Sequence, residues 1–136
     1  MKTFNLRLMN PERNYFSDDI IEVIAPSLSG IVTFWADHTT YLTALKSDEL
    51  VVKNNKNQIT YYAISNGFAE FSHNTLNILV GSFEKAQDID IKKAQERKKE
   101  AKIILKNNRD QMQDATLLTI LEKEITRIRV AGKIPH

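Results

Sequence analysis

The chain has 136 residues, of which 42% are hydrophobic and 26% are charged, and its formal net charge is +2. This length and composition are typical of one globular domain, or of a small domain with an appendage. The sequence contains no cysteine, which excludes a disulfide scaffold, a thiolate zinc site and a cysteine nucleophile. No apolar run approaches the roughly 18 residues of a membrane-spanning helix, so we expect no direct membrane span.

Charge and aromatic residues divide the chain into two parts. Residues 1–90 carry 7 Lys and Arg against 11 Asp and Glu, a net charge of −4, whereas residues 91–136 carry 12 against 6, a net charge of +6. All eleven aromatic residues lie between Phe4 and Phe83. We therefore predict two domains, residues 1–87 and residues 88–136.

Two segments near the N-terminus show the alternation of half-buried strands. Apolar and polar side chains alternate over residues 4–8. A second alternating set runs over residues 21–25, with its apolar members at the odd positions, and we expect Pro26 to end this strand.

A hairpin and a final strand complete the first domain. Residues 50–52 and 59–64 are rich in β-branched and aromatic side chains and flank the asparagine-rich residues 53–57. Asparagine adopts left-handed backbone at low cost, so this segment predicts the tip of a hairpin. Residues 76–80 alternate again. Together these patterns predict an antiparallel β-sandwich of eight to ten strands.

The second domain is predicted to be an antiparallel two-helix hairpin. Helix-forming residues run without Gly or Pro over residues 91–106, and an aspartate of residues 88–90 can cap the first turn. A second helix is expected over residues 111–131, with Gly132 as its C-terminal cap.

Each helix has an apolar seam that is expected to face its partner. The seam of the first helix is thin and consists of Ile91, Ala94, Ala101 and Leu105. The seam of the second is spaced as one helical face and consists of Leu118, Leu121, Ile125 and Ile128.

No catalytic or metal-binding pattern is present in the sequence. His38, His73 and His136 are far apart, and none has the spacing of a metal-binding motif. There is also no glycine-rich phosphate loop. We predict that the chain is not an enzyme and holds no metal.

The basic second domain leaves three interpretations open. Its lysines can form a solvated helix face, bind nucleic acid, or dock onto an acidic protein surface. The lack of aromatic residues here argues against nucleic acid. Docking is favoured by Lys123 and Arg127, one helical turn apart, with Arg129 nearby. A stand-alone adaptor with such a basic hairpin is the alternative function.

Four segments, in chain order, carry a resemblance to a known family. Residues 33–45 match a family pattern at His38 and at residues 42–45, and residues 65–68 are similar to its Ser-Gly-Gly-Phe. Residues 84–90 and 127–131 resemble the segments that enter its first helix and end its second. These segments resemble the epsilon subunits of the F-type rotary ATP synthases, the subunit that is called delta in mitochondria.

The resemblance implies a non-catalytic subunit of the central stalk that couples ion translocation to ATP synthesis. Its partners would be the gamma subunit, the membrane c-ring and the alpha and beta subunits. The resemblance places the contacts with gamma or the c-ring at Ile31, His38, Ser65, Gly67 and Phe68. It also implies a position peripheral to an energy-transducing membrane, on the cytoplasmic side in a bacterium or on the matrix or stromal side in an organelle.

The resemblance further implies that the helical hairpin inhibits ATP hydrolysis. The basic face of Lys123, Arg127 and Arg129 would then meet acidic segments of the beta subunits.

The family's nucleotide motif is changed in this chain. Its Ile-Asp-x-x-Arg-Ala corresponds to residues 89–94, with Lys93 in place of the arginine, and Lys123 replaces a second arginine. Lysine lacks arginine's planar two-point grip on phosphate. We therefore expect Asp90, Lys93, Lys123 and Arg127 to bind ATP weakly or not at all, and we predict no cofactor.

Overall fold

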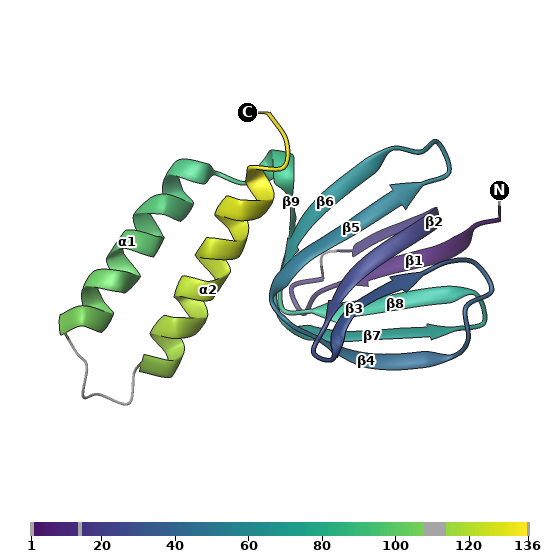
Figure 1. The fold of residues 1–136 in the computed structure, drawn as a ribbon, viewed down its shortest axis with the longest axis horizontal. Helices are drawn as coiled ribbons and strands as arrows, with labels where there is room; N and C mark the ends of the chain where they lie inside the picture. Colours follow the sequence, from purple (N-terminus) through teal and green to yellow (C-terminus); the bar gives the residue numbers. More distant parts are fainter. Residues whose placement is uncertain (1, 14, 108–113, 136) are drawn as a thin grey trace. The chain divides into compact units, whose positions relative to one another are not determined.

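The chain forms two compact units, Met1–Lys85 and Ala86–His136. The structure is a computed structural model that describes residues 2–13, 15–107 and 114–135. The first unit contains the β-strands and the second the helices (Figure 1). The domain boundary expected between residues 87 and 88 stays a prediction.

The first unit has nine strands among its described residues, which confirms the predicted β-sandwich. The strands are β1 (Phe4–Met9), β2 (Tyr15–Ser27), β3 (Gly30–Phe34), β4 (Tyr41–Leu45), β5 (Asp48–Asn54), β6 (Ile59–Ile64), β7 (Gly67–Ser72), β8 (Thr75–Val80) and β9 (Phe83–Lys85). Their order in the sheet is β1-β8-β7-β4-β2-β5-β6-β9, and β3 pairs with β2. The described pairs are antiparallel except β1 with β8, which is parallel.

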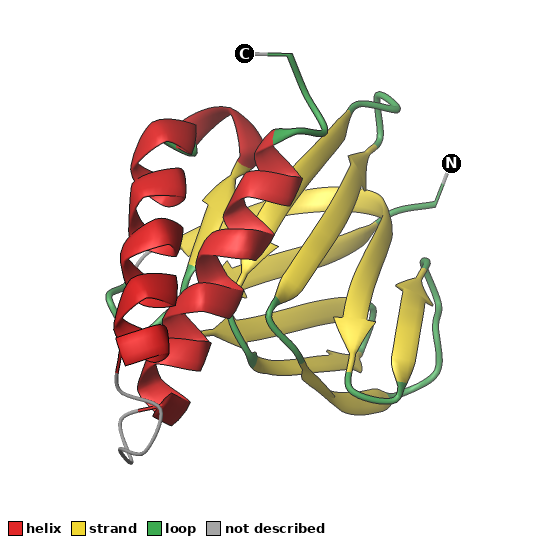
Figure 2. Cartoon of the chain, turned by 60° about the vertical axis from the view of Figure 1, so that its left-hand side comes forward, coloured by secondary structure: helices red, strands yellow, loops and turns green. Residues whose placement is uncertain are grey.

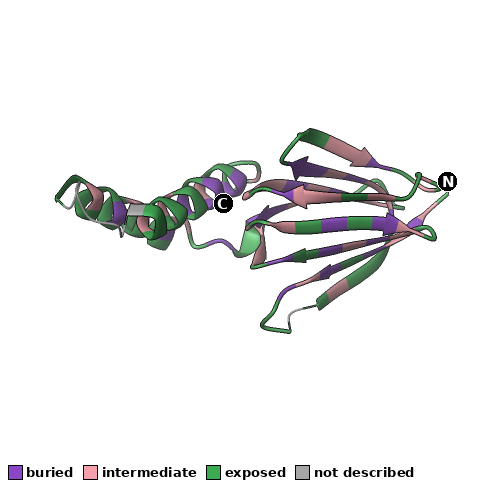
Figure 3. Ribbon diagram, turned by 90° about the horizontal axis from the view of Figure 1, so that it is seen from below, coloured by how far each residue is buried: buried purple, intermediate pink, exposed green. Residues whose placement is uncertain are grey.

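The long strand β2 connects the two layers of the sandwich. Its first residues pair with β1, and its later residues pair with β3 and β5. The strands alternate buried and exposed residues, as expected when one face of each strand is turned inward (Figure 3). The core between the layers includes Phe4, Leu6, Leu8, Val23, Phe34, Leu50, Phe71 and Ile78. Burying each large side chain contributes roughly 1.5–3 kcal/mol.

The alternation predicted for residues 21–25 is wrong at its start. Ile20 is buried and Ile21 is only half-buried, because the register of β2 against β5 shifts between Ile20 and Glu22. Such a bulge shifts the alternation by one residue, so residues before and after it that are an even number apart face opposite sides of the sheet.

Pro26 does not end β2, contrary to expectation. It pairs with Ile31 of β3, and its carbonyl accepts a hydrogen bond from the Lys46 amide at 2.9 Å. Proline lacks a backbone donor but keeps its acceptor, so it can occupy this position of the strand.

The predicted hairpin tip is confirmed. Asn57 has a positive φ of 60°, in the left-handed region. The side-chain oxygen of Asn54 accepts hydrogen bonds from the amides of Lys56 and Gln58. These bonds hold the β5–β6 turn from within.

The second unit consists of a short 3₁₀ turn, η1 (Ala86–Asp88), and two helices that pack antiparallel, α1 (Ile91–Asn107) and α2 (Asp114–Ala131) (Figure 2). Asp90 caps α1 as predicted, because its carboxylate accepts from the Lys93 amide at 3.0 Å. The predicted start of the second helix at residues 111–113 lies outside the described residues. Gly132 follows α2 without the positive φ of a left-handed cap.

The predicted seam of α1 is confirmed. The predicted seam of α2 is wrong at two of its four positions, because Leu121 and Ile128 are half-buried but the other two are exposed. On α1, Ala94 and Ala101 are buried and the other two seam residues are half-buried. On α2, Leu118 and Ile125 are exposed, 55% and 41% respectively, whereas Glu124 and Arg127 are buried. The ion pair between these two side chains satisfies both charges, and this allows a polar face to be buried.

Candidate interaction surfaces

The candidate sites among the described residues are surfaces and shallow clefts. Among residues 2–13, 15–107 and 114–135, no helix is long and apolar enough to cross a membrane. In the same residues, no group of three or more His, Cys, Asp or Glu side chains could hold a metal ion. The candidate sites are therefore an apolar face of the sandwich, a cleft beside Ile31 and the basic surface of the hairpin.

The outward face of the sandwich has a row of apolar side chains that crosses five strands. Neighbouring strands pair at these positions, so the side chains stand directly beside one another. From β4 to β2, the members of this outer row are Ala44, Phe68, Leu79, Met9 and Tyr15. Phe68, Leu79 and Tyr15 are 59%, 50% and 60% exposed.

Two more leucines extend the outer row at its β4 end. Leu42 is exposed and lies two residues before Ala44, hence on the same face of the strand. Leu28 is also exposed, and its amide donates a hydrogen bond to the Ala44 carbonyl at 3.0 Å. Contiguous exposed apolar surface of this kind marks sites of protein association.

Phe68 is the only member of this row that was predicted from the sequence as a contact residue. A usable signal was present, because Leu79 and Met9 are apolar residues at positions that alternation assigns to solvent. These two residues form one surface only because the register of the strands places them side by side. The register depends on pairings between distant segments.

Ser65 and Gly67 support the turn that presents Phe68. The Ser65 hydroxyl accepts a hydrogen bond from the Ser82 amide at 2.7 Å, and the Ser65 amide donates to the Ser82 carbonyl. At Gly67, a Cβ atom would collide with the carbonyl oxygen of Leu79. Glycine is therefore required for the close approach of β7 and β8.

His38 lies on the inward side of the sandwich, apart from Phe68. Its ring centroid is 5.1 Å from that of Phe34 and 5.3 Å from that of Phe71. Its Nδ1 is 2.7 Å from the Thr39 carbonyl oxygen, to which it donates. Phe71 is buried, so it faces the opposite side of β7 from Phe68. His38 is thus part of an aromatic cluster at the edge of the core.

Ile31 lies on β3, beside a small cleft. Its side chain is 77% exposed. The cleft has a volume of about 170 Å³, and its lining includes Pro26, Lys46 and Asp48. The Lys46 Nζ and Asp48 Oδ2 atoms are 3.8 Å apart. The five predicted rotor contacts therefore do not form one patch, and their contact role stays a prediction.

The predicted basic face of α2 is divided by burial. Lys123 and Arg129 are exposed, but Arg127 is buried and its Nη1 donates to Glu124 Oε2 at 2.9 Å. The exposed basic surface of α2 therefore consists of Lys123 and Arg129 without Arg127.

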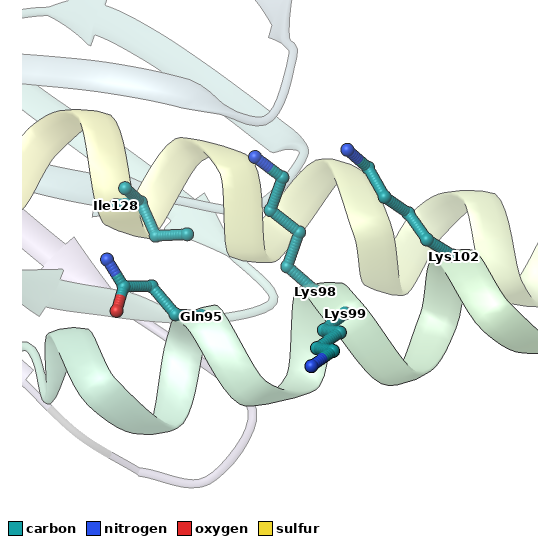
Figure 4. Close-up of a pocket in the computed structure, with 5 residues that line it drawn as sticks. All are labelled: Gln95, Lys98, Lys99, Lys102 and Ile128. Carbon is teal, nitrogen blue, oxygen red and sulfur yellow. The ribbon is translucent and has the colours of Figure 1, made fainter.

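A groove between the two helices is also lined by cations. Its volume is about 340 Å³, and it is lined by Gln95, Lys98, Lys99, Lys102 and Ile128. Lys98 and Lys102 extend in the same direction, whereas Lys99 turns away from them (Figure 4). Like charges that are four residues apart on a helix repel each other.

Two of the four predicted ATP-binding residues have other partners. Asp90 caps α1 through the Lys93 amide, and Arg127 is paired with Glu124. Lys93 and Lys123 are exposed on different helices. A phosphate would therefore compete with a helix cap and a buried ion pair.

The described residues thus combine a β-sandwich with a two-helix hairpin and carry exposed apolar and basic surfaces. The family model of the ATP synthase delta/epsilon chain β-sandwich domain matches residues 3–86. The ATP synthase epsilon chain of Nitratidesulfovibrio vulgaris (strain DP4) is 30% identical over 131 residues, which are 96% of this chain and 97% of that one. The chloroplastic epsilon chain of Marchantia polymorpha is 32% identical over 134 residues, 96% of this chain and 98% of that one. The chain therefore belongs to the delta/epsilon family of ATP synthase subunits, which confirms the resemblance.

A solved structure has the same fold over nearly the whole chain. A chain of the Euglena gracilis mitochondrial ATP synthase, in a structure of its OSCP, F1 and c-ring parts, aligns with a TM-score of 0.80 at 19% identity. The alignment covers 97% of this chain and 82% of that one.

Proposed function

We propose that this chain is a non-catalytic central-stalk subunit of an F-type ATP synthase, coupling ion translocation to ATP synthesis. Its sandwich docks onto the gamma subunit through the outer row, and the row is the observation that carries the proposal. Aromatic residues and methionine are enriched at the centres of protein interfaces, and the row contains Tyr15, Phe68 and Met9. Its apolar character suits a partner that stays bound.

The contact with the c-ring is assigned to the cleft beside Ile31. This cleft is small and has charged side chains in its lining, Lys46 and Asp48, as well as apolar ones. It therefore suits a limited contact with a partly polar loop. The chain would then lie at the periphery of an energy-transducing membrane, on the cytoplasmic side in a bacterium or on the matrix or stromal side in an organelle.

The hairpin is assigned a regulatory role. The exposed cations Lys123 and Arg129 of α2 engage acidic segments of the beta subunits and restrain ATP hydrolysis. Residues 91–136 have a net charge of +6, and this supports attraction to an acidic surface.

The docking surface is tested with Leu79→Glu and, as a matched control, Asn77→Glu. Both positions lie on the outward face of β8, but only Leu79 belongs to the outer row. We expect Leu79→Glu to weaken binding to purified gamma at least about tenfold in a pull-down titration, because a charge would be buried without a partner. Asn77→Glu should bind within about twofold of the original chain. Unchanged binding by Leu79→Glu would remove the outer row as the docking surface.

A further inference from the structure

A buried carboxylate bridges the two helices of the hairpin. Glu124 of α2 is only 2% exposed. Its Oε2 accepts a hydrogen bond from Arg127 Nη1 of the same helix at 2.9 Å. Its Oε1 is 3.8 Å from Arg97 Nη1 of α1. One side chain thus connects a cation of its own helix with a cation of the other.

The two ion pairs respond differently to separation of the helices. Arg127 lies three residues after Glu124, so this pair can persist on an isolated α2. The pair with Arg97 exists only while the helices are together. Water would solvate all three charges in a separated hairpin, so opening does not leave an uncompensated charge in the interior.

The closed hairpin leaves its larger apolar side chains in water. Leu118, Ile120 and Ile125 of α2 are exposed, as are Ile103 and Ile104 of α1. The residues buried along α1 are alanines, Ala94 and Ala101. Half-buried apolar residues such as Leu105 and Leu121 add a limited apolar contact. The pairing of α1 with α2 therefore combines a small apolar area with a polar bridge. The two exposed residues of the α2 seam, Leu118 and Ile125, therefore stay accessible to another helical surface.

We propose that Glu124 is a latch that keeps α2 closed on α1. Replacing its carboxylate with a neutral group leaves the buried guanidinium of Arg127 without this counter-charge in the closed state only. The equilibrium between closed and open hairpins then shifts towards the open form, in which Leu118 and Ile125 can pack against another surface. The consequence for ATP hydrolysis rests on the proposed function, whereas the latch is a property of the chain by itself.

The latch is tested by a distance between the helices in the full chain. The sequence has no cysteine, so Lys92→Cys on α1 and Lys123→Cys on α2 allow site-specific spin labelling at two exposed positions. Double electron–electron resonance spectroscopy then measures the distribution of distances between the two spin labels. We expect a single short distance for the labelled chain, and at least a tenfold higher ratio of open to closed molecules when Glu124→Gln is added.

Glu122→Gln is the matched control, because it makes the same change two residues away at an exposed position of the same helix. It should leave the distance distribution unchanged. If Glu124→Gln loses helical content by circular dichroism, Arg97→Gln is used in its place, since it removes only the bridge to α1. Replacing both Glu124 and Arg127 with leucine should keep the hairpin closed, because an apolar pair can substitute for a buried ion pair. Distances for Glu124→Gln and Arg97→Gln that equal those of the labelled original chain would overturn the latch.

A second measurement separates the latch from the regulatory role. In the assembled enzyme, Glu124→Gln without labels should slow ATP hydrolysis, because an open hairpin reaches the catalytic subunits more often. Opening of the isolated chain without a change in hydrolysis would uphold the latch and reject the regulatory function. The absence of opening would reject the latch whatever the rate of hydrolysis.

Discussion

The sandwich and the hairpin bury different kinds of side chain. The core of the sandwich is built from aromatic and branched residues such as Phe34, Phe71 and Ile78. The helices of the hairpin bury mainly small side chains and a Glu124–Arg127 pair, and their leucines and isoleucines are half-buried or exposed. A close-packed apolar core fixes one arrangement, because each change leaves a cavity or a clash. A thin interface lacks this constraint, and the proposed latch therefore concerns the hairpin and not the sandwich.

The largest expected effect is on the stability of the sandwich. Phe71 stacks on Phe34 with ring centroids 5.8 Å apart and meets the edge of Phe4 at 5.5 Å. Phe71→Ala should lower the free energy of unfolding by about 3–5 kcal/mol, measured by denaturant titration. Phe68 is on the same strand but exposed, so Phe68→Ala should change the free energy of unfolding by no more than about 0.5 kcal/mol. Equal losses would show that the core is not where the structure places it.

The next effect concerns the independence of the two parts. A chain that ends after residue 90 keeps every aromatic residue and all nine strands. It should unfold cooperatively, with near-ultraviolet dichroism like that of the full chain, and should still bind gamma. If the hairpin restrains the enzyme, ATP hydrolysis should rise severalfold with the shortened chain. A shortened chain that is unfolded would mean that the sandwich depends on the helices.

A smaller gain in hydrolysis is expected from charge alone. Lys123→Ala combined with Arg129→Ala should reproduce part of the severalfold rise. The difference from the original chain should shrink at high salt, because exposed charges are screened over about 8 Å at physiological ionic strength. Lys102→Ala combined with Lys106→Ala removes the same charge from α1 and should have no such effect. An equal rise in ATP hydrolysis for both double variants would indicate that net charge, and not a docking face, is responsible.

The smallest expected effect is that of ATP on the isolated chain. Ligand binding stabilises the folded state by mass action, and a dissociation constant above about 10 mM adds less than ~0.1 kcal/mol at about 1 mM ATP. We therefore expect no measurable shift of Tm at millimolar ATP. A clear rise that Lys93→Ala abolishes would contradict this expectation and would mean that ATP displaces Glu124 from Arg127.

The sequence predicted most of the sandwich because its signals are local. Alternation over residues 4–8 identified core residues, and the asparagines of residues 53–57 identified a turn that is held by Asn54 and by the left-handed Asn57. The residues of β2 that face the core could not be predicted in the same way. The bulge near Ile20 arises from pairing with β5, a segment far along the chain.

The functional surfaces were harder to predict, because they depend on which faces meet. The helical period of residues 118–128 defines an apolar seam but does not tell whether that seam faces α1. A buried Glu124 is unexpected until its two arginines are placed beside it. The outer row similarly exists only through the register of five strands. The contact roles of all five predicted rotor residues, Ile31, His38, Ser65, Gly67 and Phe68, stay predictions.

The two pairings of β1 have a consequence for synthesis on the ribosome. β1 can pair with β2 as soon as residue 20 has emerged, but its other edge pairs in parallel with β8, where Asn5 is opposite Thr75. At the usual rate of translation, that edge waits on the order of 10 s for its partner. An unpaired strand edge is a template for association with other chains. Until β8 is made, the nascent β1–β2 ribbon therefore exposes this edge of β1 to pairing with other chains.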